Sequence, residues 1–440
     1  MVSTLMPAPT AYESSRRLIA IGLNGDGSFA RDNIESAIDF GYRAVHLTTV
    51  YSKEVVKAYY GKAASYSYWN GCSAGGKQGF KEVQMFPEDY DGVLAGAPAA
   101  WTPHLDGHQY WRNIFVNTLD TPRHITPTQF TVIKQEVLRQ CDAVDGLVDG
   151  IISRPTRCTL DYNQFSCNTT SMSSIFNSTT CLSPDQLQTY ITLRNDWHSE
   201  ENGELLFPAH QLGTEEQWGT NSGGTPYGVT GNYFDYQVLN YTQYFPQAPS
   251  SNEPNVTIDG KLINKTQLEY LVRLGDQITA DGTTAFNPNI TGFVKSGRKL
   301  IHYHGGADGN IPTGSSLIYR DRLLKTMGDI SDNYRFYEVP GLLHCTGGAG
   351  PISFGQAYAK PNALKGVGKS LYNNATYNIM YALMDWVENG TAPSYVVGAQ
   401  YNDNDINHGV NLTRKICPYP QTAQYMAEMD PYDQASFFCA

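Results

Sequence analysis

The stretch Gly71-Cys72-Ser73-Ala74-Gly75 constrains the fold more than any other part of the chain. It has the pattern G-x-S-x-G, with a strand-like segment at 66–70 before it and a helix-like run at 77–86 after it. A strand, a tight turn and a helix in this order form a nucleophile elbow, which lifts the serine hydroxyl out of the backbone. We expect a side chain at either glycine of the pattern to crowd this turn. A plain glycine-rich turn is the alternative.

The rest of the chain predicts an α/β fold in which strands and helices alternate before and after a long insert. Apolar spacing and glycine boundaries predict these further elements: strands at 18–23, 91–96, 299–304 and 334–339, and helices at 37–60, 315–327 and 372–389. Between residues 103 and 297 the chain is rich in Asn, Thr, Ser, Gly and Tyr, which favours a lid domain. We therefore predict an α/β-hydrolase core with a mainly parallel sheet, formed by residues 1–102 and 298–440, and an inserted lid at 103–297.

Composition excludes two classes of partner. The 440 residues carry a net charge of −11 without a long basic run, so nucleic acid and anionic membranes are poor partners. No apolar stretch of 18 residues is present, so no membrane span is predicted. The 30 Tyr and 17 Phe favour aromatic or sugar-bearing ligands, and half-buried surface explains them equally well.

Eight cysteines and nine N-x-[ST] sequons indicate an oxidised, glycosylated, secreted protein, although no secretory signal is visible. Six of the cysteines form local pairs: Cys141 with Cys158, Cys167 with Cys181, and Cys417 with Cys439. No C-x-x-C occurs, which argues against zinc ligation by thiols. The sequons are at Asn168, Asn177, Asn240, Asn255, Asn264, Asn289, Asn374, Asn389 and Asn411.

A serine nucleophile needs a base and a carboxylate that orients the base. In this fold the three follow in the order Ser, Asp or Glu, His, each at the end of a strand. Ser73, Asp308 and His344 have this order and position. Asp308 could instead only shape a turn, and the rival histidines are His104, His302 and His304.

The two remaining cysteines support this choice independently. Cys72 directly precedes Ser73, and Cys345 directly follows His344. A disulfide between them would hold the two loops together, because bridged Cα atoms lie only about 4.4–6.8 Å apart.

Cys72-Ser73, Asp308 and His344-Cys345 resemble the CS–D–HC arrangement of the fungal tannase and feruloyl esterase family. The segments 40–46, 71–79 and 86–92 resemble the family as well. The resemblance implies a secreted serine esterase that hydrolyses phenolic carboxylic esters, feruloyl-like or galloyl, on plant cell-wall polysaccharide or tannin. It implies that Ser73 is the nucleophile, His344 the general base and Asp308 the residue that orients His344.

A second site is predicted in the lid, where the segment 141–151 places three carboxylates close together. Calcium binds six to eight oxygens from carboxylates and backbone carbonyls. The candidate ligands are the side chains of Asp142, Asp145 and Asp149 and the carbonyls of Leu147 and Ile151. A pair of Asp-Gly turns is the alternative, and the family resemblance, which implies a structural calcium in the lid, favours the metal.

The N-terminal part of the fold is short. Only 72 residues precede Ser73, and the family's first strands and its glycine-rich oxyanion loop have no clear counterpart. The N–H of Ala74 supplies one oxyanion donor, and the segment 24–27 is a weak substitute for the second. The alternative to an active esterase is therefore an N-terminally truncated remnant that binds aromatic or glycan ligands. Trp101, His104 and Trp111, at the start of the insert, are candidates for the substrate pocket, and a core role for each Trp is the alternative.

Overall fold

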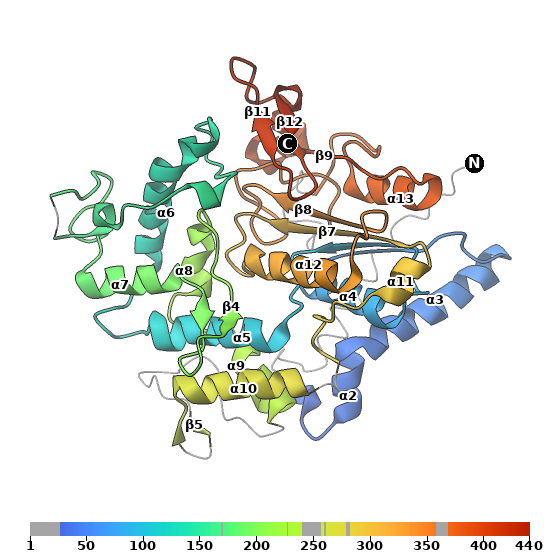
Figure 1. Ribbon diagram of the computed structural model, residues 1–440, viewed down its shortest axis with the longest axis horizontal. Coiled ribbons are helices and arrows are strands. Elements are labelled where there is room, and N and C mark those ends of the chain that lie inside the picture. The colour runs from blue at the N-terminus through green and yellow to red at the C-terminus, as the bar shows by residue number, and fades with distance from the viewer. Residues whose placement is uncertain are drawn as a thin grey trace.

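The computed structural model describes residues 27–168, 170–226, 228–239, 257–258, 261–278, 282–357 and 368–440. The predicted strand at 18–23 lies outside these residues. The described chain forms a central sheet with helices on both sides and a separate group of helices beside it (Figure 1).

The central sheet has four described strands in the order β1-β2-β7-β8, and all are parallel. They are β1 (Tyr68–Cys72), β2 (Gly92–Gly96), β7 (Lys299–Gly305) and β8 (Tyr334–Val339). Each strand begins and ends within two residues of its predicted bounds. The carboxyl ends of the strands meet at one edge of the sheet, where Cys72 is paired with Gly96. The predicted α/β fold is therefore confirmed, and this edge is where the site is built.

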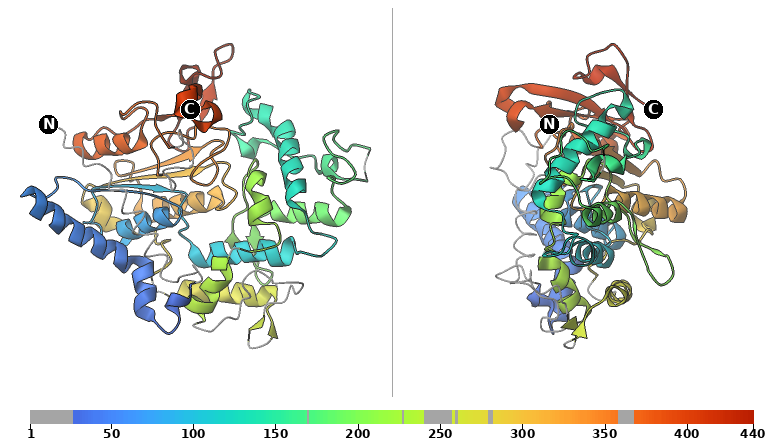
Figure 2. Two further views of the ribbon diagram at one scale, coloured as in Figure 1. Left: turned by 180° about the vertical axis from the view of Figure 1, so that it is seen from behind. Right: turned by 90° about the vertical axis from the view of Figure 1, so that its left-hand side faces the viewer.

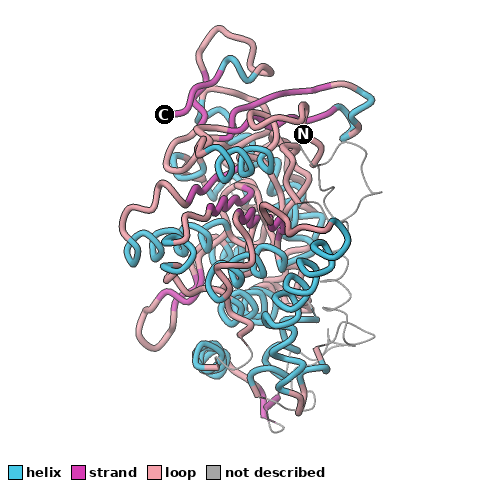
Figure 3. Tube along the Cα trace, turned by 90° about the vertical axis from the view of Figure 1, so that its right-hand side faces the viewer, coloured by secondary structure: helices cyan, strands magenta, loops and turns pink. Residues whose placement is uncertain are grey.

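Side chains alternate between the two faces of the sheet, as the strand repeat requires. Val93 and Leu300 pack with Phe80 and Val83 of the elbow helix α4 (Ala74–Met85). On the other face, Leu94 packs against α13 (Ile379–Asn389). Both faces are thus covered, and the strands lie in the middle of the molecule (Figure 3).

The remaining helices belong to the core or to the insert. In the core are α2 (Ile34–Ile38), α3 (Ala44–Tyr60), α11 (Thr291–Lys295) and α12 (Thr313–Met327). In the insert are α5 (Thr102–Tyr110), α6 (Pro127–Cys141), α7 (Pro184–Leu193), α8 (Trp218–Asn221), α9 (Gly228–Asn232) and α10 (Lys265–Gln277), with β3 (Trp197–His198), β4 (Leu205–Phe207), β5 (Thr257–Ile258) and β6 (Lys261–Leu262).

The insert has a hydrophobic core of its own. Phe130, Tyr190 and Trp218 are fully buried there, in a cluster whose members all lie between residues 101 and 278. Figure 2 shows this group of helices beside the sheet rather than over one of its faces. Phe286 and Phe293 fall within the predicted lid range, yet they pack against the core.

Two predicted helices differ from the structure. The one predicted at 37–60 is interrupted by a π-helical turn, Asp39–Arg43, between α2 and α3. The one predicted from residue 372 begins only at Ile379, because the Asn378 side chain caps it by accepting from the N–H groups of Met380 and Tyr381.

The C-terminal region adds two antiparallel ribbons that the sequence reading did not predict. These are β9 (Val396–Tyr401) with β10 (Val410–Ile416), and β11 (Ala423–Tyr425) with β12 (Phe437–Cys439). The disulfide between Cys417 and Cys439 connects the two ribbons.

Candidate active site

Ser73 occupies the turn between β1 and α4, where its backbone has φ 63° and ψ −119°. A non-glycine residue at positive φ is strained, and nucleophile elbows carry this strain at the serine. A Cβ on Gly71 would lie 2.6 Å from the carbonyl oxygen of Gly75, so the turn excludes a side chain there.

The expected crowding at Gly75 is wrong, because a Cβ at Gly75 would meet no atom within 4 Å. The glycine that the packing does require is Gly76. Its Cβ would lie 2.2 Å from the carbonyl oxygen of Gly96 on β2. The close approach of α4 to the sheet therefore depends on a residue just outside the G-x-S-x-G pattern.

The structure brings the three predicted residues together in one hydrogen-bonded series. His344 Nε2 lies 2.8 Å from Ser73 Oγ, and His344 Nδ1 lies 2.8 Å from Asp308 Oδ2. Because a carboxylate only accepts, Nδ1–H donates to Asp308 and Nε2 is left to accept the serine proton. Asp308 follows β7 and His344 follows β8, so both reach Ser73 from the same edge of the sheet.

Asp308 is fully buried and is held as a carboxylate. Its Oδ1 accepts from the backbone N–H groups of Asn310 and Ile311, both at 2.9 Å. Burial alone would raise the pKa of this carboxyl. The charge and hydrogen bonds of His344 and His304 outweigh burial and hold the pKa well below its usual range.

His304 is a second imidazole partner of Asp308, with its Nε2 3.2 Å from Oδ2. The same Nε2 lies 3.0 Å from the Ile311 carbonyl oxygen, which can only accept, so Nε2 carries the proton. His304 Nδ1 then accepts from Ser316 Oγ at 2.7 Å. Sequence reasoning treated His304 as a rival base, and the structure places it behind Asp308 instead.

His302 extends this series away from the site. Its Nε2 lies 2.8 Å from Ser316 Oγ, and its Nδ1 lies 3.0 Å from Tyr334 Oη. Burial, and after it the nearby His304, holds the pKa of His302 well below its usual range. His302 is thus a neutral, buried residue.

The disulfide between Cys72 and Cys345 connects the Ser73 and His344 loops, with the two Cα atoms 6.0 Å apart. The other three disulfides join the same local pairs that the sequence predicts.

Several residues of the inserted segment contact the loops of the site, and Gln217 contacts two of these loops. Gln217 accepts through Oε1 from the N–H of Gly309 at 2.9 Å and from the N–H of His344 at 3.4 Å. It thereby touches both loops that present the base and its carboxylate. The sequence gives no local signal for this contact, because Gln217 lies 92 residues from Gly309.

The predicted oxyanion donor lies beside the nucleophile. Ala74 is the first residue of α4, where backbone N–H groups have no partner within the helix. Most of the candidate second donor, the segment 24–27, lies outside the described residues.

Of the pocket candidates, His104 and Trp111 are buried and Trp101 is half-buried. Trp101 stacks between His104 and Phe286, with ring centroids at 3.8 and 4.6 Å. Trp111 is buried and stacks on Trp197 at 5.7 Å. These contacts favour the core role for Trp111, whereas Trp101 also lines a small cavity with Phe207 and Phe286.

In the predicted calcium loop, the carboxylates accept hydrogen bonds from neighbouring backbone N–H groups. Asp142 accepts from the N–H groups of Gly150 and Ile151, and Asp149 accepts from the same N–H of Ile151. Burial, opposed by hydrogen bonds and reinforced by the charge of Asp149, raises the pKa of Asp142. Burial also raises the pKa of Asp145.

These side chains offer oxygen atoms, the ligand type that calcium prefers, but the oxygens of the three Asp residues do not all lie within 4.8 Å of one another. Asp149 is the least available of the candidate calcium ligands, because its second oxygen accepts a hydrogen bond from Arg414 Nη2 at 2.7 Å.

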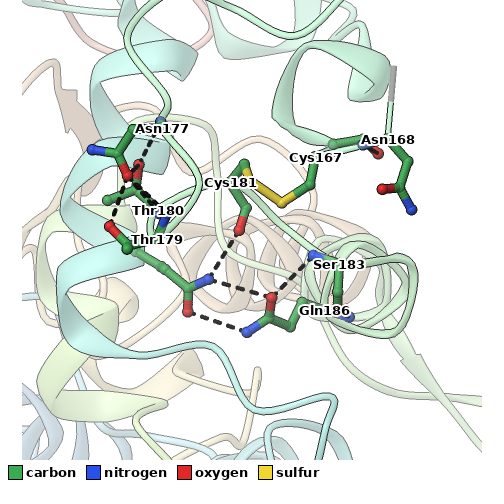
Figure 4. The surroundings of a disulfide bond; sticks show 10 residues. Cys167, Asn168, Asn177, Thr179, Thr180, Cys181, Ser183 and Gln186 are labelled. Carbon is green, nitrogen blue, oxygen red and sulfur yellow. Dashed lines mark hydrogen bonds between the residues drawn. A yellow bond between two sulfur atoms is a disulfide. The ribbon is translucent and has the colours of Figure 1, made fainter.

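The lid also carries exposed sequons beside its second disulfide, between Cys167 and Cys181 (Figure 4). Asn177 is exposed, and its side-chain oxygen accepts from the hydroxyl of Thr179 within the same sequon. All the sequon asparagines within the described residues are exposed. Asn240 and Asn255 lie outside the described residues.

Among the described residues, no helix combines the length and apolar character needed to cross a bilayer.

Comparison with known proteins identifies the family. A family model described as "Tannase and feruloyl esterase" matches residues 17–440. The probable feruloyl esterase B-1 of Aspergillus oryzae is 32% identical, over 98% of this chain and 75% of that protein. Feruloyl esterase B of Aspergillus niger is 31% identical, over 95% of this chain and 75% of its own length.

Solved structures agree with the sequence comparison. The crystal structure of feruloyl esterase B from Aspergillus oryzae matches with a TM-score of 0.81 and 31% identity, covering 94% of this chain and 78% of that one. Tannin acyl hydrolase from Aspergillus niger, at 23% identity and a TM-score of 0.69, shares the fold. The chain therefore belongs to the tannase and feruloyl esterase family and is a carboxylic ester hydrolase.

Proposed function

We propose that the chain hydrolyses esters of phenolic carboxylic acids through an acyl-enzyme on Ser73. The observation that carries this proposal is the hydrogen-bonded series from Ser73 Oγ through His344 to the buried carboxylate of Asp308. In this arrangement His344 Nε2 removes the hydroxyl proton as Oγ attacks the ester carbonyl carbon. Asp308 keeps the proton on Nδ1 and stabilises the imidazolium that forms.

In the remaining steps His344 passes the serine proton to the alcohol and then takes a proton from water. The N–H of Ala74 donates to the oxyanion of the tetrahedral intermediate, as the position after an elbow serine allows. The imidazolium then protonates the alcohol oxygen, the ester C–O bond breaks, and the acyl group stays on Oγ. A water molecule gives a proton to Nε2 as it attacks the acyl carbonyl carbon. The imidazolium then gives this proton to Oγ as the C–Oγ bond breaks, which releases the acid and restores the Ser73 hydroxyl.

The names of the relatives support a phenolic acyl group, either hydroxycinnamoyl, such as ferulate, or galloyl. Substrates of this class occur on plant cell-wall polysaccharide and in tannins. A secreted, glycosylated protein suits such substrates, and four disulfides and the exposed sequons support this localisation. We include in the proposal a structural calcium ion held by Asp142, Asp145 and Asp149 with the carbonyls of Leu147 and Ile151.

The test is release of free acid from methyl ferulate and methyl gallate by the wild-type chain and by Ser73→Ala. We expect turnover of one of these esters and a loss on the order of 10⁶ in kcat in the variant. The rates on the two esters distinguish the acyl groups. If folded wild-type protein releases neither acid, the esterase proposal is wrong for these substrates, and a role in binding aromatic or glycan ligands becomes the better one.

A further inference from the structure

Three potential metal ligands meet between α3 and the end of α4, away from the residues described above. His46 lies on α3, Glu82 on α4, and Asp89 in the loop that leads to β2. His46 Nδ1 is 2.6 Å from Asp89 Oδ2, and one ligand atom from each residue lies within 4.8 Å of the others. No other group of three His, Cys, Asp or Glu in the described part of the chain is this close.

Glu82 is the member of this group whose surroundings indicate a bound ligand. It is 1% exposed, and neither of its carboxylate oxygens has a hydrogen-bond partner. A buried carboxylate without a partner is costly unless a cation or a proton neutralises it. Burial, and after it the neighbouring Asp89, raises the pKa of Glu82 to about 9.

Positive charge near His46, Glu82 and Asp89 does not balance the two carboxylates. Lys53 is the nearby ammonium, and its Nζ donates to the backbone carbonyls of Glu88 and Asp89 rather than to Glu82. Its charge opposes the rise in the pKa of Glu82 only in part. The imidazole of His46 stacks on Phe86 at 3.8 Å, and this contact fixes the plane in which its nitrogens can reach a ligand.

We propose that His46, Glu82 and Asp89 bind a divalent transition metal of the zinc type. One imidazole nitrogen with two carboxylate oxygens suits zinc, whereas calcium prefers oxygen alone. Bonds of about 2.0–2.2 Å to one ion place ligand atoms roughly 3.3 Å apart, so His46 Nδ1 and Asp89 Oδ2 would separate from their present 2.6 Å as the ion replaces their hydrogen bond. The His46 side chain is 24% exposed, which gives the ion a route from solvent and leaves room for water as a fourth ligand.

Such an ion would stabilise the packing of α3. This helix has 17 residues, yet only Val45 and Thr49 are buried. A metal would join α3 to α4 and to the loop before β2 at a point where few apolar contacts hold them.

Zinc binding to the full chain tests the proposal, measured by calorimetry after chelation and with calcium in excess to saturate the lid loop. We expect one zinc ion per chain, and at least a tenfold loss of affinity in both His46→Ala and Glu82→Gln. Glu82→Gln has the shape of the neutral acid, so it keeps the fold even if His46→Ala does not. The control is His408→Ala, because His408 pairs with Asp403 on the surface and belongs to no close group of three such ligands in the described part of the chain.

A cobalt-loaded sample provides a second measurement, since the absorption of Co²⁺ reports its coordination number. A four-coordinate spectrum that is lost in Glu82→Gln supports the site. Absence of zinc binding in the wild type, or binding that persists in both variants, overturns the proposal and leaves a proton shared between Glu82 and Asp89. No free thiol competes for the metal, because all eight cysteines form disulfides.

Discussion

Asp308 has partners on both sides, and His304 is the partner that only the structure reveals. His304 donates to the carboxylate through Nε2 without contacting Ser73, so it acts as a positioning residue. Its own orientation is fixed by Ile311 and Ser316. The alternation of side chains along β7 does not predict that His304 contacts Asp308, because their contact depends on how the chain turns after β7.

Replacing His304 tests this role. We expect His304→Leu to lower kcat about tenfold, as loss of one charge-assisted hydrogen bond allows. KM for the ester should change less than kcat, because His304 acts on Asp308 and does not contact Ser73. His304→Gln, which keeps an N–H donor, should restore part of kcat. Equal kcat values for the Leu and Gln variants, with normal stability, would contradict the role.

Glu82 makes stability depend on pH in metal-free protein. Its pKa of about 9 in the folded state lies above the usual value, so the folded chain holds a proton that the unfolded chain releases. The free energy of unfolding should therefore fall as pH rises from about 5 to 9. In chelator, denaturant unfolding at pH 5, 7 and 9 should show a smaller fall for Glu82→Gln. The exposed Glu54→Gln should behave as wild type, and parallel curves for all three proteins would refute the prediction.

At the scale of elements, the central strands were predictable because each is a short apolar run bounded by turn residues. The strand at 334–339 has the bounds that the sequence predicts. The start of α13 was misplaced because the helical spacing continues before Asn378, whereas the cap decides where the helix begins. The ribbon of β9 and β10 was missed because its strands are joined by a polar segment, 402–409, without a two-residue hairpin turn.

The disulfide between Cys72 and Cys345 closes the longest covalent loop in the chain, with a sequence separation of 273. The chain-entropy relation gives a loss of about 5.6 kcal/mol in unfolding free energy for Cys72→Ala with Cys345→Ala. The matched control is Cys167→Ala with Cys181→Ala, whose separation of 14 gives about 3 kcal/mol. Denaturant unfolding of the two double variants measures the difference, and a greater loss from the short loop would contradict this account.

The lid loop around Asp142 and Asp145 predicts a response to calcium. Chelation should lower Tm, and calcium at about 100 times its Kd should add about 2.7 kcal/mol to the unfolding free energy. Asp145→Asn should weaken this response, since it removes a carboxylate from the all-oxygen set. Thermal scans in EGTA and in calcium provide the measurement. An unchanged Tm in wild-type protein would favour two simple Asp-Gly turns.

At the scale of the whole molecule, the site depends on contacts between the lid and the core. The order of Ser73, Asp308 and His344 along the chain predicted which loops meet. Gln217 supports two of these loops, and the sequence does not predict this contact. It depends on how two separately packed clusters lie against each other.

Gln217→Leu should therefore lower kcat about tenfold, because it leaves the N–H groups of Gly309 and His344 without their acceptor at the lid boundary. KM for the ester should change less than kcat. The control is Gln188→Leu, an exposed substitution on the outer side of the lid, on α7. If both variants keep wild-type kcat, the lid only covers the site and does not support it.

The long disulfide also has a consequence for how the chain is made. Ser73 and Cys72 leave the ribosome long before His344 and Cys345, which are the last members of the site to be synthesised. Four other cysteines emerge in between, and each could capture Cys72. They lie in two pairs separated by only 17 and 14 residues, and short loops close at the least entropic cost. The lid pairs thus remove the competing thiols early and leave Cys72 for its distant partner.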